Sequence, residues 1–423
     1  MIRFLLFLLF LTSTIHYRIE LGLFSFALVE PVALLVSGVL LLYQLGVRRR
    51  LAIRKDPLLY FFVGITLWAA LIRPWASDWQ HGLSDVRDWF IPVLSFVALI
   101  FSIRCNWRQW LVLFVFLAVI NASVGIYQHL TNTFRPFAAE LAAYKTGFLL
   151  SPDRSRLAIA SPAIGFFSHP NGFAMYLFLA LLTALGWPVK GRQHWVKVPV
   201  ILLLSVALFW TYAKASLLVM LFSIVGFEFA RRMKSWGQFL VVSAGLVLCG
   251  GTITWFISRQ VPPAYLATFW WRVNLWQTAL RVIRDSPGVL LVGNGMEMFA
   301  AQAIYPQPHN LYLYLLLVYG LPGLGLVLGI AWYLLRCGWV AHRRRLFRQE
   351  PLLGALWIGL MGYFAIGLVE SNLMGIGSRM VFLTVAACFV GLWHEVRIDS
   401  KVAIVSEGNI ANARGTITRS VSL

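Results

Sequence analysis

Residues 309–335 read HNLYLYLLLVYGLPGLGLVLGIAWYLL. After the pair His309-Asn310 the stretch contains no acidic or basic side chain. It is longer than the roughly 20 residues with which an α-helix crosses about 30 Å of hydrocarbon. We therefore expect residues 309–335 to form a membrane-spanning helix.

The composition of the whole chain agrees with that expectation. Of its 423 residues, 60% are apolar and only 12% are charged, whereas soluble domains carry roughly 25% charged residues. The mean hydropathy of +0.76 points the same way. The expected fold class is an all-α polytopic membrane protein.

Apolar runs of similar length recur along the chain and predict about 12 transmembrane helices. The predicted segments are 3–16, 27–46, 57–75, 86–103, 109–130, 170–188, 197–212, 215–231, 237–257, 309–335, 352–371 and 376–394. The first run is also short enough to be a signal-peptide core. We expect a retained helix instead, because no clear small-x-small cleavage site precedes Tyr17.

The formal net charge of +20 is distributed in a way that argues against nucleic-acid binding. Basic residues fall in short clusters at every second loop, which is the pattern of the positive-inside rule. The clusters are Arg48, Arg49, Arg50, Arg54 and Lys55; Arg104 and Arg108; Lys190, Arg192 and Lys197; Arg231, Arg232 and Lys234; and Arg336, Arg343, Arg344, Arg345 and Arg348. We expect these loops and both termini on the cytoplasmic side.

With that orientation, two long loops lie on the extracytoplasmic side. Loops of such length without simple linker composition usually carry function. The expected parts are helices 1–5 in residues 1–130, a first periplasmic loop at 131–169, helices 6–9 in 170–257, a larger periplasmic loop at 258–308, helices 10–12 in 309–394, and a cytoplasmic tail at 395–423.

The larger loop contains a helical pattern of its own. Trp270, Trp271 and Trp276 recur at helical spacing with aliphatic residues, and Ser286-Pro287-Gly288 provides a stop. The pattern predicts an amphipathic helix in the lipid headgroup region. The alternative is that these tryptophans only form an aromatic belt.

Three segments on the predicted extracytoplasmic face carry its candidate polar residues. The first runs from Gly165 to Asn171 and includes His169, and the second is the turn Thr211–Ser216 with Lys214. The third runs from Arg272 through Gly293-Asn294-Gly295 to His309-Asn310. Their shared face is the argument for one site.

Lys214 is a single cation in a short turn between strongly apolar helices. A cation there opposes the positive-inside trend and loses hydration near the membrane, so we expect it to have an anionic partner. The alternative is a lysine that extends to headgroup phosphates.

Arg272, Arg154 and Arg156 are further cations on this face. A guanidinium binds phosphate through two parallel N–H donors, which suits a diphosphate; the alternative is contact with lipid headgroups. Gly293-x-Gly295 has the spacing of part of a phosphate loop. It follows no predicted strand and opens no βαβ unit, which argues against a dinucleotide site.

His309 follows Pro306 and Pro308, which restrict the backbone before the helix. An imidazole with an unperturbed pKa of about 6.5 suits proton abstraction near neutral pH. The alternative is a structural histidine at the membrane interface. The four cysteines lie singly in or beside apolar runs without zinc-ligand spacing, so we expect them to pack in the core.

From about Arg156 to Gly329 the chain resembles the superfamily of O-antigen ligases and O-antigen polymerases. The landmarks are Gly165-Phe166-Phe167-Ser168-His169-Pro170-Asn171, Thr211-x-x-Lys214-x-Ser216, Arg272-x-x-x-Trp276 with Gly293-x-Gly295, and His309-Asn310-Leu311-Tyr312 followed by Gly320 and Gly323-Leu324-Gly325. The family usually has arginine where this chain has Lys214. Lysine keeps the charge but loses the two-pronged donor.

The resemblance implies transfer of a glycan from undecaprenyl diphosphate to an acceptor hydroxyl outside the bacterial inner membrane. Arg156, Lys214 and Arg272, with Arg154 beside them, would hold the diphosphate and stabilise its growing charge, while His309 would take the acceptor's proton. The supporting residues would be His169, Asn171, Asn310, Gly293 and Gly295. Because lipid diphosphate is already an activated leaving group, neither a cofactor nor a metal is expected.

The acceptor expected first is lipid A-core, which would make the protein an O-antigen ligase. A polymerase that extends the glycan on its carrier, or an exopolysaccharide or protein-glycosylating relative, is the alternative. A secondary transporter with 12 helices remains a different class. Transporters usually place ionisable residues at midplane in broken helices, whereas the polar segments here lie on one outer face.

Overall fold

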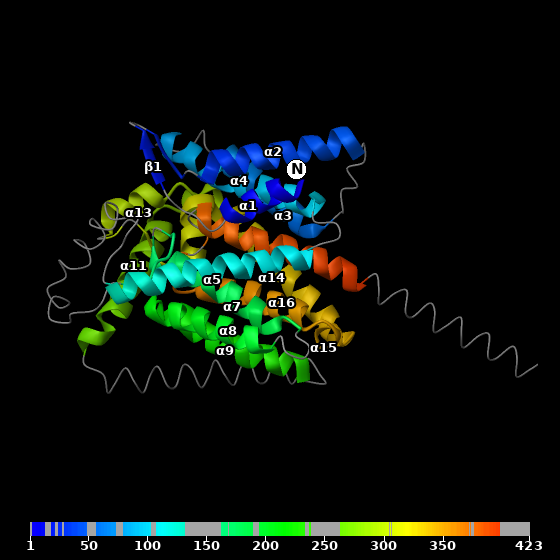
Figure 1. Cartoon of the computed structure of the whole chain (residues 1–423). Coiled ribbons are helices and arrows are strands. Elements are labelled where there is room, and N and C mark those ends of the chain that lie inside the picture. The colour runs from blue at the N-terminus through cyan, green and yellow to red at the C-terminus, as the bar shows by residue number, and fades with distance from the viewer. Residues whose placement is uncertain are drawn as a thin grey trace, which may run out of the picture.

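The computed structural model describes most of the predicted helical segments. The residues described are 2–12, 18–21, 24–27, 29–48, 56–72, 79–102, 107–131, 162–167, 169–188, 194–232, 237, 263–303, 305, 307–371, 373 and 376–397. Within this part of the chain, helices dominate (Figure 1). The loop predicted at 131–169, the span predicted at 237–257 and the tail predicted at 395–423 lie largely or wholly outside the described residues.

The helices are bounded as follows. They are α1 Ile2–Thr12, α2 Val29–Arg48, α3 Pro57–Leu71, α4 Trp79–Ser102, α5 Trp107–Thr131, α7 Pro170–Gly186, α8 His194–Trp210, α9 Lys214–Arg232, α11 Pro263–Asp285, α12 Gly288–Val292, α13 Met296–Gln302, α14 Leu311–Arg343, α15 Leu346–Gln349, α16 Pro351–Ile366 and a last helix Ile376–Arg397. Strands β1 (Arg18–Leu21) and β2 (Phe24–Ala27) form one short antiparallel hairpin.

The predicted spans coincide with these helices, apart from 237–257. By length and composition, three described helices are suited to cross a membrane: Trp107–Thr131, Leu311–Arg343 and Ile376–Arg397. Further apolar helices are shorter, among them Pro57–Leu71 and Pro351–Ile366. The protein is therefore a helical membrane protein. That all 12 predicted segments cross the membrane remains a prediction.

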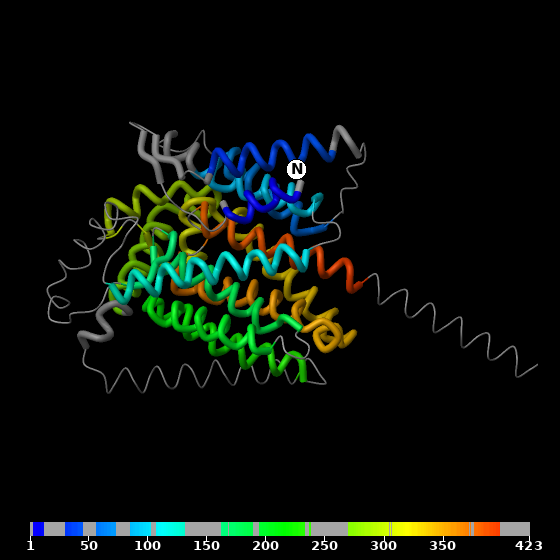
Figure 2. Tube along the Cα trace, in the orientation of Figure 1, coloured from blue at the N-terminus to red at the C-terminus, as the bar shows by residue number. Residues whose placement is uncertain are grey.

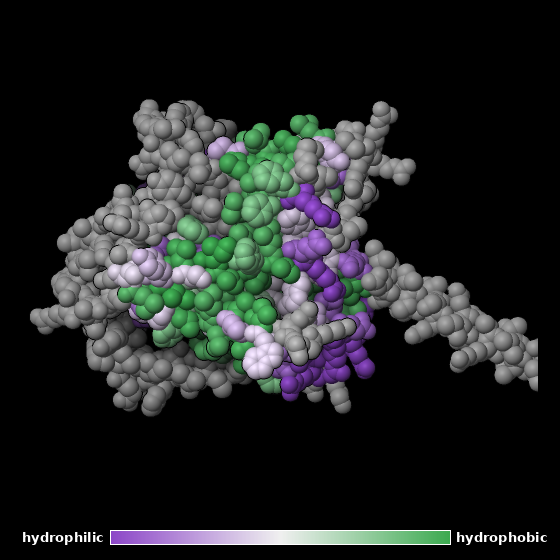
Figure 3. Space-filling model, in the orientation of Figure 1, coloured by the Kyte–Doolittle hydropathy of each residue, from purple (hydrophilic) through white to green (hydrophobic). Residues whose placement is uncertain are grey.

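The main helices lie side by side along one common direction (Figures 1 and 2). The pair α2 and α4 forms one edge, α8 and α9 form the opposite edge, and α5, α7, α14 and α16 lie between them. Helices α11 and α13 lie at one end of this bundle and α15 at the other. In Figure 3, apolar side chains form a band across the middle, and hydrophilic ones gather at the end where α15 lies.

The core of the bundle is formed by α7, α16 and the last helix. Nearly every residue of α7 from Phe173 to Ala184 is buried, and α16 is buried along most of its length. A helix that is apolar all round is expected in the centre of a membrane bundle. Cys337 and Cys388 are buried in this core, as the sequence predicts, while Cys105 and Cys249 lie outside the described residues.

Helix α14 contains a kink that the hydropathy pattern does not reveal. Gly320 has a φ of 63°, and Pro322 lacks the N–H that a helix would use. The carbonyls freed by this break find other donors: Gly295 N donates to Leu317 O at 2.7 Å and Asn294 N to Val318 O at 3.4 Å.

The larger loop folds onto this kink. The amphipathic helix predicted there is α11, which begins at Pro263 and ends at Asp285 directly before Ser286-Pro287-Gly288. Its apolar side chains pack in a small separate core that includes Leu275, Ala279, Phe299 and Leu317 of α14. The loop is thus anchored to the membrane helix that begins at Leu311, which fixes α11 beside His309.

Candidate functional site

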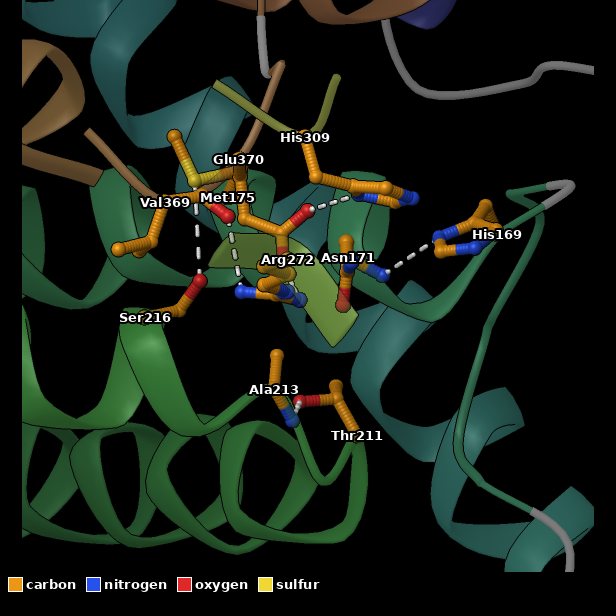
Figure 4. Close-up of polar contacts among 10 residues, drawn as sticks. All are labelled: His169, Asn171, Met175, Thr211, Ala213, Ser216, Arg272, His309, Val369 and Glu370. Atoms are coloured by element: carbon orange, nitrogen blue, oxygen red, sulfur yellow. Dashed lines mark hydrogen bonds and ion pairs between the residues drawn. The ribbon is translucent and has the colours of Figure 1, made fainter. Parts of the chain in front are cut away.

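The site is built around Glu370, which lies in the connection between α16 and the last helix. Its two carboxylate oxygens face different partners. Oε1 accepts a hydrogen bond from Arg272 Nη2 of α11, and Oε2 lies 3.2 Å from Nδ1 of His309 (Figure 4). The three side chains are 11%, 19% and 13% exposed, respectively, so the group is shielded but still open at the surface.

Arg272 also holds the backbone next to Glu370. Its Nη1 donates to Val369 O at 2.8 Å, and its Nε is buried without a hydrogen-bond partner among the described residues. Both η nitrogens therefore face the protein. The sequence predicts Arg272 as a diphosphate clamp, whereas in the structure it supports the carboxylate that contacts His309.

His309 is held in an uncommon conformation at the start of α14. Its φ of 46° lies in the left-handed region, which costs a residue other than glycine about 1–2 kcal/mol. The ring stacks on Tyr305 with centroids 5.1 Å apart and lies 5.3 Å from Trp271. Such strain persists only where the surroundings fix it, and it is found often at functional sites.

The next residue, Asn310, ties this turn to the connection that carries Glu370. Its Oδ1 caps α14 by accepting from Tyr312 N and Leu313 N, each at 3.0 Å. Its Nδ2 donates to Leu368 O at 2.7 Å. The Asn310 predicted as a supporting residue therefore fixes both the helix start and the approach of His309 to Glu370.

Electrostatics favour an ionised Glu370. Burial acts to raise the pKa of this carboxyl, but the hydrogen bond with His309 and the charge of Arg272 outweigh it and hold the pKa below its usual value. An ionised carboxylate only accepts hydrogen bonds, so Nδ1 of His309 is the donor. In the neutral form of the ring, Nε2 then has the lone pair that can accept a proton.

His169 lies on the other side of this group, at the start of α7. Its Nδ1 accepts from Asn171 N at 3.1 Å and caps the helix (Figure 4). Burial lowers the pKa of His169; the charge of Glu370 raises it in part, and His309 adds to the lowering. The segment before it is tied to α5, because Asn121 Oδ1 accepts from Phe166 N and Gln128 Nε2 donates to Gly165 O.

The turn with Lys214 lies below Arg272 in Figure 4, where Thr211 and Ala213 mark it. Ala213 N donates to Thr211 Oγ1 at 3.2 Å, and Ser216 joins α9 to α7 through Met175. Lys214 is the first residue of α9, and its side chain is exposed. Among the described residues, no hydrogen bond or ion pair joins it to an acidic partner.

The remaining predicted residues have other surroundings. Gly293 and Gly295 pack against the α14 kink: a Cβ on Gly293 would lie 2.2 Å from Val318 O, and the amide of Gly295 is bonded to Leu317 O. They shape the loop and direct no free amide at a ligand. Arg154 and Arg156 lie outside the described residues.

Glu370 is the site residue that sequence reasoning does not select. The signal for it is an isolated carboxylate at the end of a long apolar run, which is costly in a membrane protein unless it is paired. Trp271 and Tyr305 are also missed as contacts of His309. Burial raises the pKa of Tyr305, and the negative charge of Glu370 raises it further.

No group of three or more His, Cys, Asp or Glu side chains that could hold a metal occurs among the residues described. No protein-family model matches the chain, and no curated protein matches it. The chemistry of the site therefore rests on its own geometry.

Proposed function

We propose that this protein is a lipid-linked glycan transferase of the O-antigen ligase type, acting at the outer face of the bacterial inner membrane. The observation that carries the proposal is the contact of His309 with Glu370, supported by Arg272, at one end of an apolar bundle. A carboxylate-oriented imidazole beside a cation at a membrane surface suits group transfer on a substrate that is itself held in the membrane.

In this proposal, His309 is the general base. Nε2 takes the proton of the acceptor hydroxyl while the hydroxyl oxygen bonds to the anomeric carbon. The bond from that carbon to the diphosphate oxygen breaks, and undecaprenyl diphosphate leaves with the electron pair. Glu370 orients the ring through Nδ1 and stabilises the imidazolium that forms, as carboxylates do in other carboxylate–histidine pairs.

The diphosphate would lie where positive charge and helix starts gather. Helices α7, α9 and α14 begin in this region, and helix N-termini favour anions. Lys214 stands at the first residue of α9, and its exposed ammonium is free of acidic partners among the described residues. We propose that Lys214, Arg154 and Arg156 contact the diphosphate directly. Arg272 acts on the diphosphate through its charge.

The orientation of the protein is part of the proposal. The basic clusters of the sequence include Arg348, whose guanidinium bonds the carbonyls of Arg231 and Arg232 at the C-terminus of α9. This is the end of α9 opposite to Lys214. The positive-inside rule puts that end, and both chain termini, in the cytoplasm, which leaves the His309 site on the periplasmic side.

The test is a transfer reaction with the purified protein in lipid. Undecaprenyl-diphosphate-linked glycan is offered either with lipid A-core or with a second carrier-linked glycan, and the products are weighed by mass spectrometry. Glycan on lipid A-core identifies a ligase, and a longer glycan on the carrier identifies a polymerase, the second candidate. Release of no carrier diphosphate with either acceptor, from protein that is folded and inserted, would contradict both.

A further inference from the structure

Arg379 is a buried arginine that the proposed mechanism leaves unused. It lies in the first turn of the last helix, Ile376–Arg397, and its side chain is fully buried. A charged side chain buried inside a membrane protein is costly and therefore rare. A residue with that cost is expected to have a role that an apolar side chain could not perform.

The contacts of Arg379 point to the connection that carries Glu370. Its Nε donates to Leu373 O at 2.6 Å, three residues after Glu370. Its guanidinium lies 4.4 Å from the ring of Trp89 on α4, and Trp89 in turn donates to the hydroxyl of Tyr319. Nη1 and Nη2 have no hydrogen-bond partner among the described residues, while the charges of Asp85 and Asp88 act on the group from α4.

Among the described residues, three side chains hold this connection by its carbonyls, and Arg379 is one of them. Asn310 of the α14 start donates to Leu368 O, Arg272 of α11 to Val369 O, and Arg379 of the last helix to Leu373 O. Leu368 and Val369 precede Glu370 in the chain, and Leu373 follows it. Glu370 is thus fixed from both sides, and Arg379 supplies the side-chain contact after it.

We propose that Arg379 is a positioning residue for glycan transfer, which keeps the carboxylate of Glu370 against Nδ1 of His309 by holding Leu373. This inference rests on the proposed function. It goes beyond it by assigning a role in the reaction to a side chain that touches neither substrate nor the base.

If Arg379 only stabilised the fold, its replacement would lower the thermal midpoint. Removing one partner of a satisfied buried pair is strongly destabilising, whereas replacing a poorly paired buried charge with an apolar side chain of similar volume is often neutral or stabilising. Because the two η nitrogens of Arg379 lack hydrogen bonds, Arg379→Met is expected to insert and to keep its thermal midpoint. Its effect should appear in the rate.

The experiment compares Arg379→Met with Arg343→Met in purified, lipid-embedded protein. Arg343 controls for the loss of an arginine that lies over a tryptophan, since its guanidinium is 4.6 Å from the ring of Trp339. Its side chain is exposed, and it stands at the opposite end of α14 from His309. We expect Arg379→Met to lower kcat on the order of 10- to 100-fold, as small displacements of catalytic groups do, with KM for the lipid-linked glycan unchanged. Arg343→Met should leave both constants at the wild-type value.

A double-mutant cycle decides whether the effect passes through Glu370. If it does, Arg379→Met lowers kcat by less than about twofold when Glu370→Gln is already present, because coupled residues are not additive. Equal losses in both backgrounds, or wild-type kcat in the single variant, would overturn the proposal. Should the Met variant fail to insert, Arg379→Lys is measured in the same two backgrounds with the same criterion. An inactive wild-type protein would instead contradict the proposed function.

Discussion

The described part of the molecule contains two carboxylate–imidazole pairs, and they differ in what else the carboxylate does. At one end, Glu370 lies 3.2 Å from His309; at the other, Asp56 lies 3.0 Å from Nε2 of His394. His309 lies just before α14, whereas Tyr333, which bonds Asp56 at 3.1 Å, lies in the second half of that helix. At about 1.5 Å per residue, the two pairs are therefore roughly 35 Å apart along α14.

Asp56 is fully committed to holding helices together. Its Oδ1 caps α3 by accepting from Leu58 N at 2.9 Å, and its Oδ2 accepts from Tyr333 and His394. It therefore joins three helices, and its own exposure is 0%. This arrangement suits a structural carboxylate, because both of its oxygens accept hydrogen bonds and the side chain is fully buried.

Glu370 also accepts a hydrogen bond from Arg272, and its histidine partner, His309, has a strained backbone. His309 has a positive φ and a ring held by Tyr305 and Trp271, and the group is partly exposed. A carboxylate–histidine contact alone therefore does not mark a site. The cation beside the carboxylate and the strained backbone of the histidine distinguish the Glu370 pair, whereas exposure does not, because His394 is 24% exposed and His309 13%.

The largest expected effect comes from removing His309. His309→Ala should lower kcat for glycan transfer by roughly 10²–10⁴, the contribution of a general base, with normal insertion and thermal midpoint. His394→Ala should leave kcat near the wild-type value and lower the thermal midpoint, because Asp56 loses one partner. Normal transfer by well-inserted His309→Ala would remove this residue from catalysis.

Variants of the two carboxylates should differ in the same way as variants of the two histidines, one in rate and the other in stability. Glu370→Gln keeps the shape of the side chain but loses the charge that orients and stabilises the imidazole, so kcat should fall on the order of 10- to 100-fold. Asp56→Asn should chiefly destabilise the fold, by about 1–3 kcal/mol for a buried polar group that loses a partner. Rates of transfer and thermal unfolding are measured on both variants. A loss of stability in Glu370→Gln together with a loss of rate in Asp56→Asn would show that Glu370 is the structural member.

A pH profile sharpens the role of Arg272. The proposed base works when the imidazole of His309 is neutral and Glu370 is ionised, so activity is lost as the pH falls and either group takes a proton. His309 and Arg272 hold the pKa of the Glu370 carboxyl below its usual value. In Arg272→Met the raising effect of burial is opposed by His309 alone, the pKa rises, and the acid limb of the kcat profile moves to higher pH. The exposed Arg281 on the same helix provides the control, Arg281→Met, whose acid limb should stay in place.

The smallest expected change concerns Lys214. Lys214→Ala should raise KM for the lipid-linked glycan by about two- to fivefold, in the range of a screened charge contact near the surface, and Lys214→Arg should restore it. Binding of undecaprenyl diphosphate to lipid-embedded protein measures the same step without turnover. Unchanged binding by the alanine variant would assign Lys214 to lipid headgroups.

The sequence predicts much of the fold because hydropathy is a local property. The apolar runs identify the described bundle helices, and the tryptophan spacing with its Pro-Gly stop identifies α11. The kink of α14 is harder to predict, since Gly320 and Pro322 are common in membrane helices. Its position follows from the donors that Gly295 and Asn294 supply, and these come from another segment.

The candidate site is predicted in part. Arg272, His309, His169 and Asn310 meet around one carboxylate, as the shared face suggests, whereas Gly293 and Gly295 prove to be packing residues of the kink. Arg272 is present, but its η nitrogens contact Glu370 and Val369. A list of cations on one face cannot show which of them is already paired, because pairing depends on side-chain directions.

The sequence by itself determined that this chain folds in a membrane and which segments form its helices, because burying apolar surface depends on composition over some 20 consecutive residues. Only the tertiary structure decided that Glu370, 61 residues after His309 and 98 after Arg272, lies between them. That contact depends on the connection after α16, which is held by donors from three separate helices. Hydrogen bonds between distant segments follow from the packing of the whole bundle and leave no periodic trace in the chain.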